Sequence, residues 1–434
     1  MTQLFDDIVA VPSAPGGVHG RIRVPPSKSL TQRAILAAAL AGPGSEVHNP
    51  LEAEDPRLLV AALQAVGFRL EWGSGRINAS GREAAARARL FLGNNATGAR
   101  FTLGLLTALP GEWLLDGTAR LRERPMAPLV DALRQLGAEI APAETASERE
   151  ELHLPLRVRG RSLTGREVRL DASASSQFVS ALLLLGATLP GGLVVRLTSA
   201  PPSRPYLALT VEVLEAFGAR VVAQDAGRVL TVSGGGLRPA VFAVEGDWSA
   251  AAFPLAAVAV AGGRVEVLEV RHDSRQGDAV ALGLLAAAGC VVRESGEGVV
   301  LEGPVHQPVI ADLRDTPDLF PALAVVVAVA GGRLDGLEGL AVKESDRLSV
   351  MTRCLVALGF AVERGAGWFA AAGARPRKPA QPTTIEPAGD HRIAMALAVA
   401  GCVLPGVRVA GSGCVVKSWP EFWQAWHGLV GGPE

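Results

Sequence analysis

The sequence repeats itself six times, and this repetition limits the possible folds more than any other feature. An apolar run that ends near a glycine, followed by a β-rich segment, recurs along all 434 residues. The marker glycines stand 67, 80, 71, 69 and 75 residues apart, at Gly44, Gly111, Gly191, Gly262, Gly331 and Gly406. Such periods exceed those of ordinary solenoids, so each copy is predicted to be a small α/β unit that needs neighbours to cover its core.

A second pattern, with an apolar residue four before and three after a glycine, alternates with the first. Its glycines are Gly67, Gly137, Gly218, Gly289 and Gly359, with Gly428 as the candidate for a degenerate sixth copy. Each unit is therefore predicted as strand, helix, strand, second helix and further strands. The first helix is apolar nearly all round and should be buried, whereas the second is amphipathic. We expect an α/β fold of two similar domains with three units each, joined near the glycine-rich stretch 233–239.

The composition excludes several classes of protein. With 42 Lys+Arg against 43 Asp+Glu the net charge is −1, so the basic surface of a nucleic-acid-binding or membrane-binding protein is not expected. The longest apolar stretches fall short of the roughly 20 residues that span a bilayer, and the first residues lack a basic signal-peptide region. No C-x-x-C spacing occurs among Cys290, Cys354, Cys402 and Cys414. This predicts neither disulfides nor a zinc site and fits a reducing cytoplasm.

Polar motifs precede all six predicted buried helices. They are PPSKSLTQR (25–33), GNNATGAR (93–100), SASSQ (173–177), EGDWS (245–249), TPD (316–318) and GDHR (389–392). Ser and Asp are ordinary N-caps, and for EGDWS capping is as good an explanation as function. Capping does not explain Lys28, Arg33, Arg100 and Arg392, because a cation at the positive end of a helix dipole is unfavourable unless an anion binds there. If these helix starts converge, the ligand is small and multiply anionic.

Two further charged segments add to this pattern. Residues 343–347 carry four charges, and LRERP (121–125) presents Arg122 and Arg124 beside a proline. A charged run is usually a solvated helix face. The alternative is that Glu344, beside cations, stays ionised and then transfers a proton. Neither a Gly-rich nucleotide-binding loop nor a G-x-S-x-G turn occurs, so nucleotide binding and serine hydrolysis have no support.

Taken together, the motifs resemble the 5-enolpyruvylshikimate-3-phosphate (EPSP) synthase family of carboxyvinyltransferases. SKSLTQR, LGNNATGAR, RERPM, SSQF, SRPY, TPD, VKESDRL, GDHRIAMA and CVVKSWPEFW stand in the family's order over nearly the whole chain. The resemblance implies an inside-out α/β barrel fold with two domains, residues 1–25 plus 245–434 and residues 26–244, and an active site in the cleft between them. It also implies a cytoplasmic monomer of the shikimate pathway to chorismate and aromatic amino acids, without metal or other cofactor.

The family's reaction implies roles for particular residues. The 5-hydroxyl of shikimate 3-phosphate adds to C2 of phosphoenolpyruvate while C3 is protonated, and the adduct then expels phosphate. By motif, shikimate 3-phosphate would be held by Lys28, Ser29, Arg33, Ser175, Ser176, Gln177, Ser203, Tyr206, Asp318 and Lys343. Phosphoenolpyruvate would be held by Lys28, Asn94, Ala96, Arg124, Gln177, Arg347, Arg392 and Lys417. Asp318 would be the general base, Glu344 the proton carrier at C3 and Lys28 a third catalytic group, with their half-reactions left open.

Three positions depart from the family pattern. Ala96 replaces the glycine that approaches phosphoenolpyruvate. An intruding methyl costs about 1–3 kcal/mol, or roughly ten- to two-hundred-fold in affinity. We therefore expect reduced sensitivity to glyphosate, which occupies the same pocket, with Gly98 as a point where the backbone can retreat. Gly339 replaces an asparagine that many relatives place on the shikimate ring, and Gly411-Ser412 replaces an acid-proline pair.

Two alternative functions fit part of the same sequence pattern. UDP-N-acetylglucosamine enolpyruvyl transferases share the architecture, but they begin with Lys-Asn and carry a reactive cysteine in the first half. Here the pair is Lys28-Ser29, and the first cysteine is Cys290. A non-enzymatic anion-binding module is the other alternative, and it would gain nothing from the carboxylates Asp318 and Glu344.

Lysine is scarce, and its positions point to the same site. The chain has only four lysines against 38 arginines. Lys28, Lys343 and Lys417 fall on the family's active-site positions, whereas Lys378 looks incidental, and the single tyrosine, Tyr206, lies in SRPY. An ammonium that can lose a proton is not replaceable by a guanidinium that stays charged. Retention of these three lysines therefore supports a role in the site.

Overall fold

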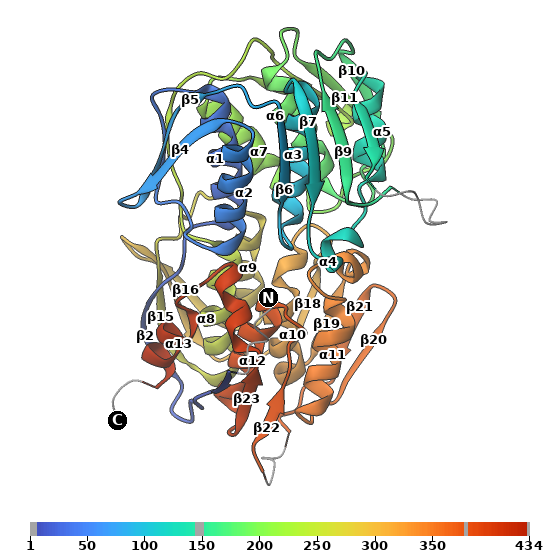
Figure 1. Ribbon diagram of the computed structural model, residues 1–434. Helices are drawn as coiled ribbons and strands as arrows, with labels where there is room; N and C mark the ends of the chain where they lie inside the picture. The colour runs from blue at the N-terminus through green and yellow to red at the C-terminus, as the bar shows by residue number, and fades with distance from the viewer. Residues whose placement is uncertain (1–6, 144–151, 377–380, 432–434) are drawn as a thin grey trace. The chain divides into compact units, whose positions relative to one another are not determined.

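The computed structural model describes residues 7–143, 152–376 and 381–431, so Lys378 lies outside the described residues. The chain divides into two compact units (Figure 1). Unit 1 comprises Met1–Pro26 and Glu245–Glu434, and unit 2 comprises Ser27–Val244. None of the helices in the described ranges has the length and apolar character that crossing a membrane requires.

Unit 2 contains three four-stranded sheets, each with one buried helix. The strands of each sheet are given in spatial order. The first sheet contains β14 (Val241–Ala243), β3 (Ser45–His48), β5 (Arg76–Arg82) and β4 (Phe68–Gly73), and the second contains β6 (Arg87–Phe91), β7 (Gly111–Asp116), β9 (Leu156–Gly160) and β8 (Glu139–Pro142). The third contains β10 (Glu167–Leu170), β11 (Leu193–Leu197), β13 (Val229–Val232) and β12 (Val221–Gln224). The buried helices are α1 (Lys28–Ala41), α3 (Ala96–Ala108) and α6 (Ser176–Thr188). The other helices are α2 (Glu54–Ala65), α4 (Ala119–Arg122), α5 (Ala127–Gln135) and α7 (Pro205–Ala216).

Unit 1 is built in a similar way, with two four-stranded sheets and one three-stranded sheet. Its sheets are β2 (Val18–Arg23), β15 (Gly263–Leu268), β17 (Gly298–Gly303), β16 (Val291–Glu294); β18 (Val309–Asp312), β19 (Gly332–Asp335), β21 (Trp368–Ala371), β20 (Val362–Gly365); and β1 (Ile8–Ala10), β23 (Val407–Ala410), β22 (Thr383–Ile385). The buried helices are α8 (Trp248–Ala261), α10 (Phe320–Ala330) and α12 (His391–Val403), and the others are α9 (Val280–Ala287), α11 (Arg347–Ala357) and α13 (Phe422–Val430). Short 3₁₀ turns that matter below are η2 (Gly277–Ala279), η3 (Pro317–Leu319), η4 (Glu338–Val342) and η5 (Ser412–Lys417).

Each four-stranded sheet begins with a parallel pair and continues antiparallel. In two of them the first strand comes from a distant part of the chain. β2 runs parallel to β15, with Val18 opposite Gly263, and β14 runs parallel to β3, with Val241 opposite Glu46. The chain therefore passes between the units twice, after Pro26 and after Val244. The stretch 233–239 precedes β14 inside unit 2, so the prediction that it links the domains is wrong.

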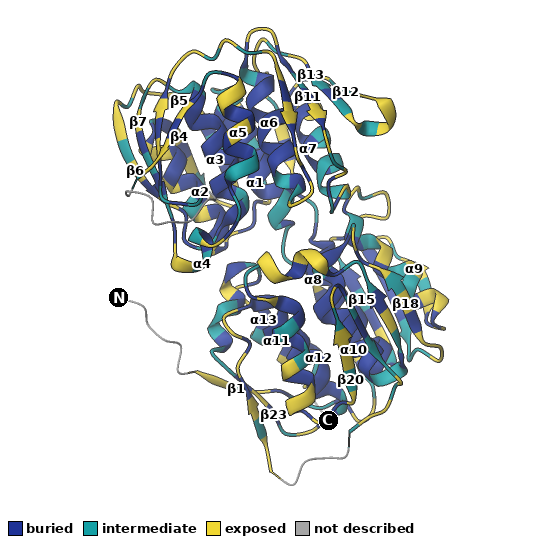
Figure 2. Ribbon diagram, turned by 90° about the vertical axis from the view of Figure 1, so that its right-hand side faces the viewer, coloured by how far each residue is buried: buried dark blue, intermediate teal, exposed yellow. Residues whose placement is uncertain are grey.

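The burial pattern confirms the α/β class and the two kinds of helix. Every residue of α8 from Trp248 to Val260 is buried, and so is every residue of α10 from Phe320 to Ala328 (Figure 2). By contrast, α5 buries one face only. Three mutually packed helices, α8, α10 and α12, form the centre of unit 1, and α3 packs on α6 in unit 2.

Glycines end only some of the buried helices. Gly262 and Gly331 directly follow α8 and α10 with φ of 80° and 88°, a backbone conformation that favours glycine. α3, α6 and α12 instead end at leucines. Gly428 lies inside α13, so the prediction that it closes a sixth copy is wrong.

Candidate active site

The predicted helix-start motifs are indeed helix starts. Five of the six buried helices have an N-cap side chain that accepts a backbone N–H of the first turn: Ser27, Asn95, Ser175, Asp247 and Asp390. The TPD motif instead forms η3, which leads into α10. Lys28 is the first residue of α1 and Arg392 the second of α12, so both cations sit where the helix dipole is positive.

In unit 2, Lys28 is held by a buried carboxylate. Its Nζ lies 3.1 Å from Oδ2 of Asp55, in the first turn of α2. The Asp55 carbonyl accepts from Asn95 Nδ2 at 2.8 Å, and the same amide donates to Gln32 Oε1 at 2.7 Å. Asn95 Oδ1 meanwhile accepts from Gly98 N at 2.8 Å. One buried asparagine therefore joins the starts of α1, α2 and α3 around Lys28.

Arg33 lies deep inside unit 2. It is 1% exposed and donates to Thr210 Oγ1 at 2.8 Å and to the carbonyls of Ser29 at 2.8 Å and Tyr206 at 3.1 Å. Burial lowers the pKa of its guanidinium to about 10, although the nearby Tyr206 acts in the opposite direction. Arg33 thereby ties the start of α7 to α1 and fixes the backbone of two predicted shikimate 3-phosphate residues, Ser29 and Tyr206.

Arg100 brings three predicted motifs together. Its Nη1 donates to Ser175 Oγ at 3.2 Å and to Gln177 Oε1 at 2.6 Å, and its Nη2 donates to the Pro125 carbonyl at 3.0 Å. Burial, and then the charge of Arg124, hold the pKa of Arg100 well below its usual value. No carboxylate in the described part of the chain pairs with Arg100. A buried cation of this kind favours an anion nearby.

The sequence identified Arg100 as an unexplained cation but gave it no role. Gln177, which Arg100 orients through Oε1, also donates from Nε2 to Thr97 Oγ1 at 2.9 Å. The starts of α3 and α6 are thus tied to each other and, through Pro125, to the segment that carries Arg124. The structure makes Arg100 the common element of this group.

In unit 1 a completely buried arginine gathers three carboxylates. Arg347 Nε donates to Asp390 Oδ2 at 3.0 Å, Nη1 to Asp318 Oδ1 at 2.9 Å and Nη2 to Glu344 Oε2 at 2.7 Å. These carboxylates raise the pKa of Arg347 above its usual value despite its burial. Asp390 also caps α12 and accepts from Ser345 Oγ at 3.0 Å. The sequence predicted Arg347 as a phosphoenolpyruvate ligand but assigned nothing to Asp390.

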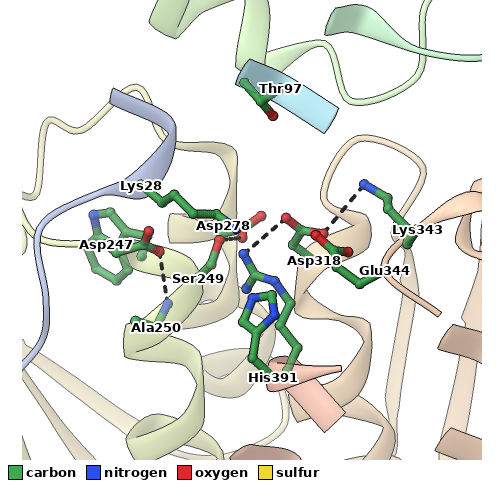
Figure 3. A network of polar contacts seen from close by, with 12 residues as sticks. Lys28, Thr97, Asp247, Ser249, Ala250, Asp278, Asp318, Lys343, Glu344 and His391 are labelled. Atoms are coloured by element: carbon green, nitrogen blue, oxygen red, sulfur yellow. Dashed lines mark hydrogen bonds and ion pairs between the residues drawn. The ribbon is translucent and has the colours of Figure 1, made fainter. Parts of the chain in front are cut away.

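Asp318 is the centre of a second set of contacts. Its Oδ1 lies 3.5 Å from Lys343 Nζ (Figure 3). Its Oδ2 lies 3.1 Å from Arg392 Nη2, and Arg347 also donates to Oδ1. Burial by itself raises the pKa of Asp318. The three cations Arg392, Lys343 and Arg347 outweigh burial and hold this pKa well below its ordinary value. The predicted catalytic carboxylates Asp318 and Glu344 therefore share one arginine within unit 1.

The other predicted site residues lie at or beside helix starts. Ser176 is the first residue of α6, and Ala96 is the first of α3, with Asn94 just ahead of it. Ser203 is buried two residues before α7 with φ of 56°, a left-handed conformation that is uncommon for serine. Lys417 is buried at the end of η5, and Arg124 is buried just after α4. No cluster of three or more potential metal-binding side chains was found in the described ranges.

Comparisons with known proteins agree on one family. The model of the EPSP synthase (3-phosphoshikimate 1-carboxyvinyltransferase) family matches residues 12–426. A curated 3-phosphoshikimate 1-carboxyvinyltransferase from Syntrophobacter fumaroxidans is 37% identical over 420 residues, covering 95% of this chain and 97% of the relative. One from Mycobacterium ulcerans is 36% identical over 433 residues, covering 97% of each.

A solved structure of similar fold points the same way. The EPSP synthase of Acinetobacter baumannii superimposes with a TM-score of 0.78 at 26% identity, covering 98% of both chains. The match to the family model extends over both units and includes every cluster of buried charge described above. This chain therefore belongs to the EPSP synthase family and is a transferase of the 3-phosphoshikimate 1-carboxyvinyltransferase type.

Proposed function

We propose that this enzyme joins the enolpyruvyl group of phosphoenolpyruvate to the 5-hydroxyl of shikimate 3-phosphate and releases phosphate. In the addition, the hydroxyl oxygen bonds to C2 while its proton goes to a base and C3 gains a proton. In the elimination, C3 loses a proton and the C2–O bond to phosphate breaks. The observation that carries the proposal is Asp318, a mostly buried carboxylate surrounded by Arg392, Lys343 and Arg347.

The cations supply the binding sites for two anionic substrates. Phosphoenolpyruvate is held by Lys28, Asn94, Ala96, Arg124, Gln177, Arg347, Arg392 and Lys417. Shikimate 3-phosphate is held by Lys28, Ser29, Arg33, Ser175, Ser176, Gln177, Ser203, Tyr206, Asp318 and Lys343. The reaction uses residues of both units, so variants in either unit should reduce turnover. Arginine and lysine beside helix N-termini are the groups that best bind phosphate and carboxylate.

The hydroxyl group of Ser175 is oriented to donate a hydrogen bond to a ligand. Its Oγ accepts from Gln177 N at 3.2 Å and from Arg100 Nη1 at 3.2 Å. Because both bonds use the oxygen as acceptor, the hydroxyl proton is directed elsewhere, toward a ligand oxygen. A phosphate oxygen of shikimate 3-phosphate fits this requirement.

Asp318 becomes a useful base only when substrate binds. With three cations beside it, its pKa lies well below the usual range, and such a carboxylate takes up a proton poorly at neutral pH. An anionic substrate that draws Arg392 or Lys343 toward its own oxygens weakens these ion pairs. The pKa of Asp318 then rises, and it can accept the proton of the 5-hydroxyl. Binding of both substrates thus activates the base.

Glu344 serves as the proton carrier at C3 of phosphoenolpyruvate. Its side chain is mostly buried, and Arg347 Nη2 donates to its Oε2 at 2.7 Å. The link through Arg347 couples the charge of Glu344 to that of Asp318. A proton gained at one carboxylate during addition therefore favours ionisation of the other, which suits a reaction that moves two protons.

We also propose that the enzyme is a cytoplasmic monomer. Its four cysteines are all unpaired, which fits a reducing compartment. The monomeric state follows from the family resemblance alone, and size-exclusion chromatography with light scattering measures it directly.

One assay tests the function. Phosphate release from phosphoenolpyruvate is measured with shikimate 3-phosphate, with UDP-N-acetylglucosamine and without an acceptor. We expect release only with shikimate 3-phosphate. Release with the UDP-sugar instead would favour the related transferase, and no release with either acceptor would favour an anion-binding module.

Lys28→Arg should lower kcat by about 10²–10⁴-fold, the range expected when a proton-transfer group is lost. The guanidinium keeps the positive charge but does not give up a proton, and it is bulkier than the ammonium that Asp55 holds at 3.1 Å. The matched control is Lys378→Arg, the same substitution at a lysine with no proposed role, which should keep the parental kcat. Equal rates for the two variants would remove Lys28 from the catalytic set.

Ala96→Gly should increase inhibition by glyphosate. Ala96 is buried at the first position of α3, so removing its methyl enlarges the proposed phosphoenolpyruvate pocket. We expect the inhibition constant to fall roughly ten- to two-hundred-fold, measured by competition with phosphoenolpyruvate. Ala99→Gly, a buried position in the same helix with no proposed contact, is the control. An unchanged constant in Ala96→Gly would contradict the steric explanation.

A further inference from the structure

Asp278 is a buried carboxyl group that the reaction proposed above does not use. It lies in η2 and is 3% exposed. Ser249, in the first turn of α8, donates a short hydrogen bond from Oγ to Asp278 Oδ2. The other oxygen, Oδ1, has no hydrogen-bond partner among the described residues. An unpaired carboxylate oxygen away from water is costly, so burial here disfavours the ionised form.

The packing of unit 1 places Asp278 beside the cluster around Asp318. The turns η2 and η3 both pack against α8, and so does α12. Ser249 is near the start of α8, Asp318 is in η3 and Arg392 is in the first turn of α12. Figure 3 shows Asp278, Ser249 and Asp318 in one group of side chains. Asp278 therefore shares its surroundings with the pair in which Arg392 Nη2 lies 3.1 Å from Asp318 Oδ2.

Some of the groups around Asp278 raise its pKa and others lower it. Burial, and then the negative charge of Asp318, raise the pKa of Asp278 to about 7, and Asp247 at the N-cap of α8 adds to this. Arg392 and the hydrogen bond from Ser249 act against the rise. The effects that raise this pKa outweigh those that lower it, so the charge of Asp278 is expected to change close to neutral pH, and each change acts on the nearby Arg392.

We propose that Asp278 is a positioning residue that controls how strongly Arg392 attracts phosphoenolpyruvate. While the Asp278 carboxyl is neutral, the positive charge of Arg392 is shared between Asp318 and the substrate. Once Asp278 loses its proton to solvent, a second carboxylate competes for the same guanidinium and the anionic substrate binds more weakly. This inference rests on the proposed role of Arg392 as a phosphoenolpyruvate ligand.

The expected signature is a rise in the KM for phosphoenolpyruvate as the pH passes through about 7. One pK unit of coupling between Asp278 and the bound substrate corresponds to about tenfold in KM. Phosphoenolpyruvate has its own titration, so the measured quantity is the ratio of the KM of the parent to that of the variant at each pH. Steady-state kinetics of the full chain over about two pH units on either side of neutrality cover the transition.

Two substitutions distinguish the electrostatic effect of Asp278 on KM from a general loss of structure. Asp278→Asn keeps the size of the side chain but cannot ionise, so KM should stay at the low-pH value and the ratio should climb about tenfold with pH. Ser249→Ala removes a bond that favours the ionised form, so the transition should move to higher pH. Asp273→Asn is the control, because it removes the same charge from an exposed position five residues earlier and should keep the parental profile.

The outcomes distinguish this inference from the proposed function. If the parent shows turnover but Asp278→Asn keeps the parental pH dependence, or if Ser249→Ala moves the transition to lower pH or not at all, the role of Asp278 is overturned. If the parent shows no turnover, the proposed function fails. In that case, calorimetric titration with phosphoenolpyruvate compares the dissociation constants of the parent and the variants at each pH. If Asp278→Asn does not fold, the shift in Ser249→Ala decides.

Discussion

Asp318→Asn should lower kcat by about 10²–10⁴-fold, the usual contribution of a general base. Asparagine has the same shape, and its single amide oxygen can accept a hydrogen bond from either Arg347 or Arg392, which contact different oxygens of Asp318. It cannot take the proton of the attacking hydroxyl. The expected result is therefore a folded protein with slow turnover. Rates of phosphate release with both substrates at saturation, together with the circular dichroism spectrum, measure the two properties separately.

A matched substitution controls for the loss of an aspartate from this part of the chain. Asp312 is exposed at the end of β18, six residues before Asp318, and its Oδ1 accepts from Arg314 N at 2.9 Å. Asparagine at position 312 keeps that bond, so the variant should have the parental kcat. If Asp318→Asn also had the parental kcat, Asp318 would not be the base, and Glu344 would be the carboxylate to test next.

Arg347→Met should cause the largest loss of stability, about 3–5 kcal/mol. The guanidinium is completely buried and bonds to Asp318, Glu344 and Asp390, so methionine leaves these buried or mostly buried carboxylates without their shared cation. For a unit of this size the loss corresponds to a fall of roughly 6–20 °C in melting temperature. Arg353→Met, at an exposed position of the same helix, should change the melting temperature little.

The loss of stability in Arg347→Met should depend on pH, and the direction of this dependence follows from the pKa of the carboxylates. In the parent, the pKa of Asp318 is depressed, so its contribution to stability is present above the ordinary carboxyl range and is lost only as the pH falls through the lowered value. In Arg347→Met the stranded carboxylates gain by taking up protons, so the deficit should be largest at neutral pH and should shrink on acidification. A deficit that is independent of pH would indicate lost packing rather than stranded charge.

Local sequence determined much of the architecture. The six glycine-marked apolar runs correspond to α1, α3, α6, α8, α10 and α12, because a helix that is apolar all round has no stable place except in a core. Five of the motifs ahead of them supply N-caps, since capping depends on residues within one turn. The linker at 233–239 was misplaced because β14 pairs with β3, about 200 residues earlier in the chain, and such pairing leaves no local signal.

In the candidate site, too, some residues are recognisable from the local sequence, whereas their contacts depend on the tertiary structure. Lys28 and Arg392 are recognisable from their motifs, because a cation at a helix start is unfavourable unless an anion binds there. Asp318 and Glu344 are recognisable from the motifs that resemble the family. Contacts between residues far apart in the chain are not recognisable in this way: Asp55 follows Lys28 by 27 residues, Asp390 follows Arg347 by 43, and Ser249 precedes Asp278 by 29. Each of these contacts joins two repeats or two helices of one repeat.

The sequence by itself therefore determined the repeat, the buried helices, the caps and the identity of the cations that are proposed to bind anions. Only the tertiary structure decided which carboxylate each cation meets and how far each is removed from water. That division has a physical reason. Helix formation and capping depend on neighbours along the chain, whereas the pKa values of Asp278, Asp318 and Arg347 depend on burial and on charges that folding brings together.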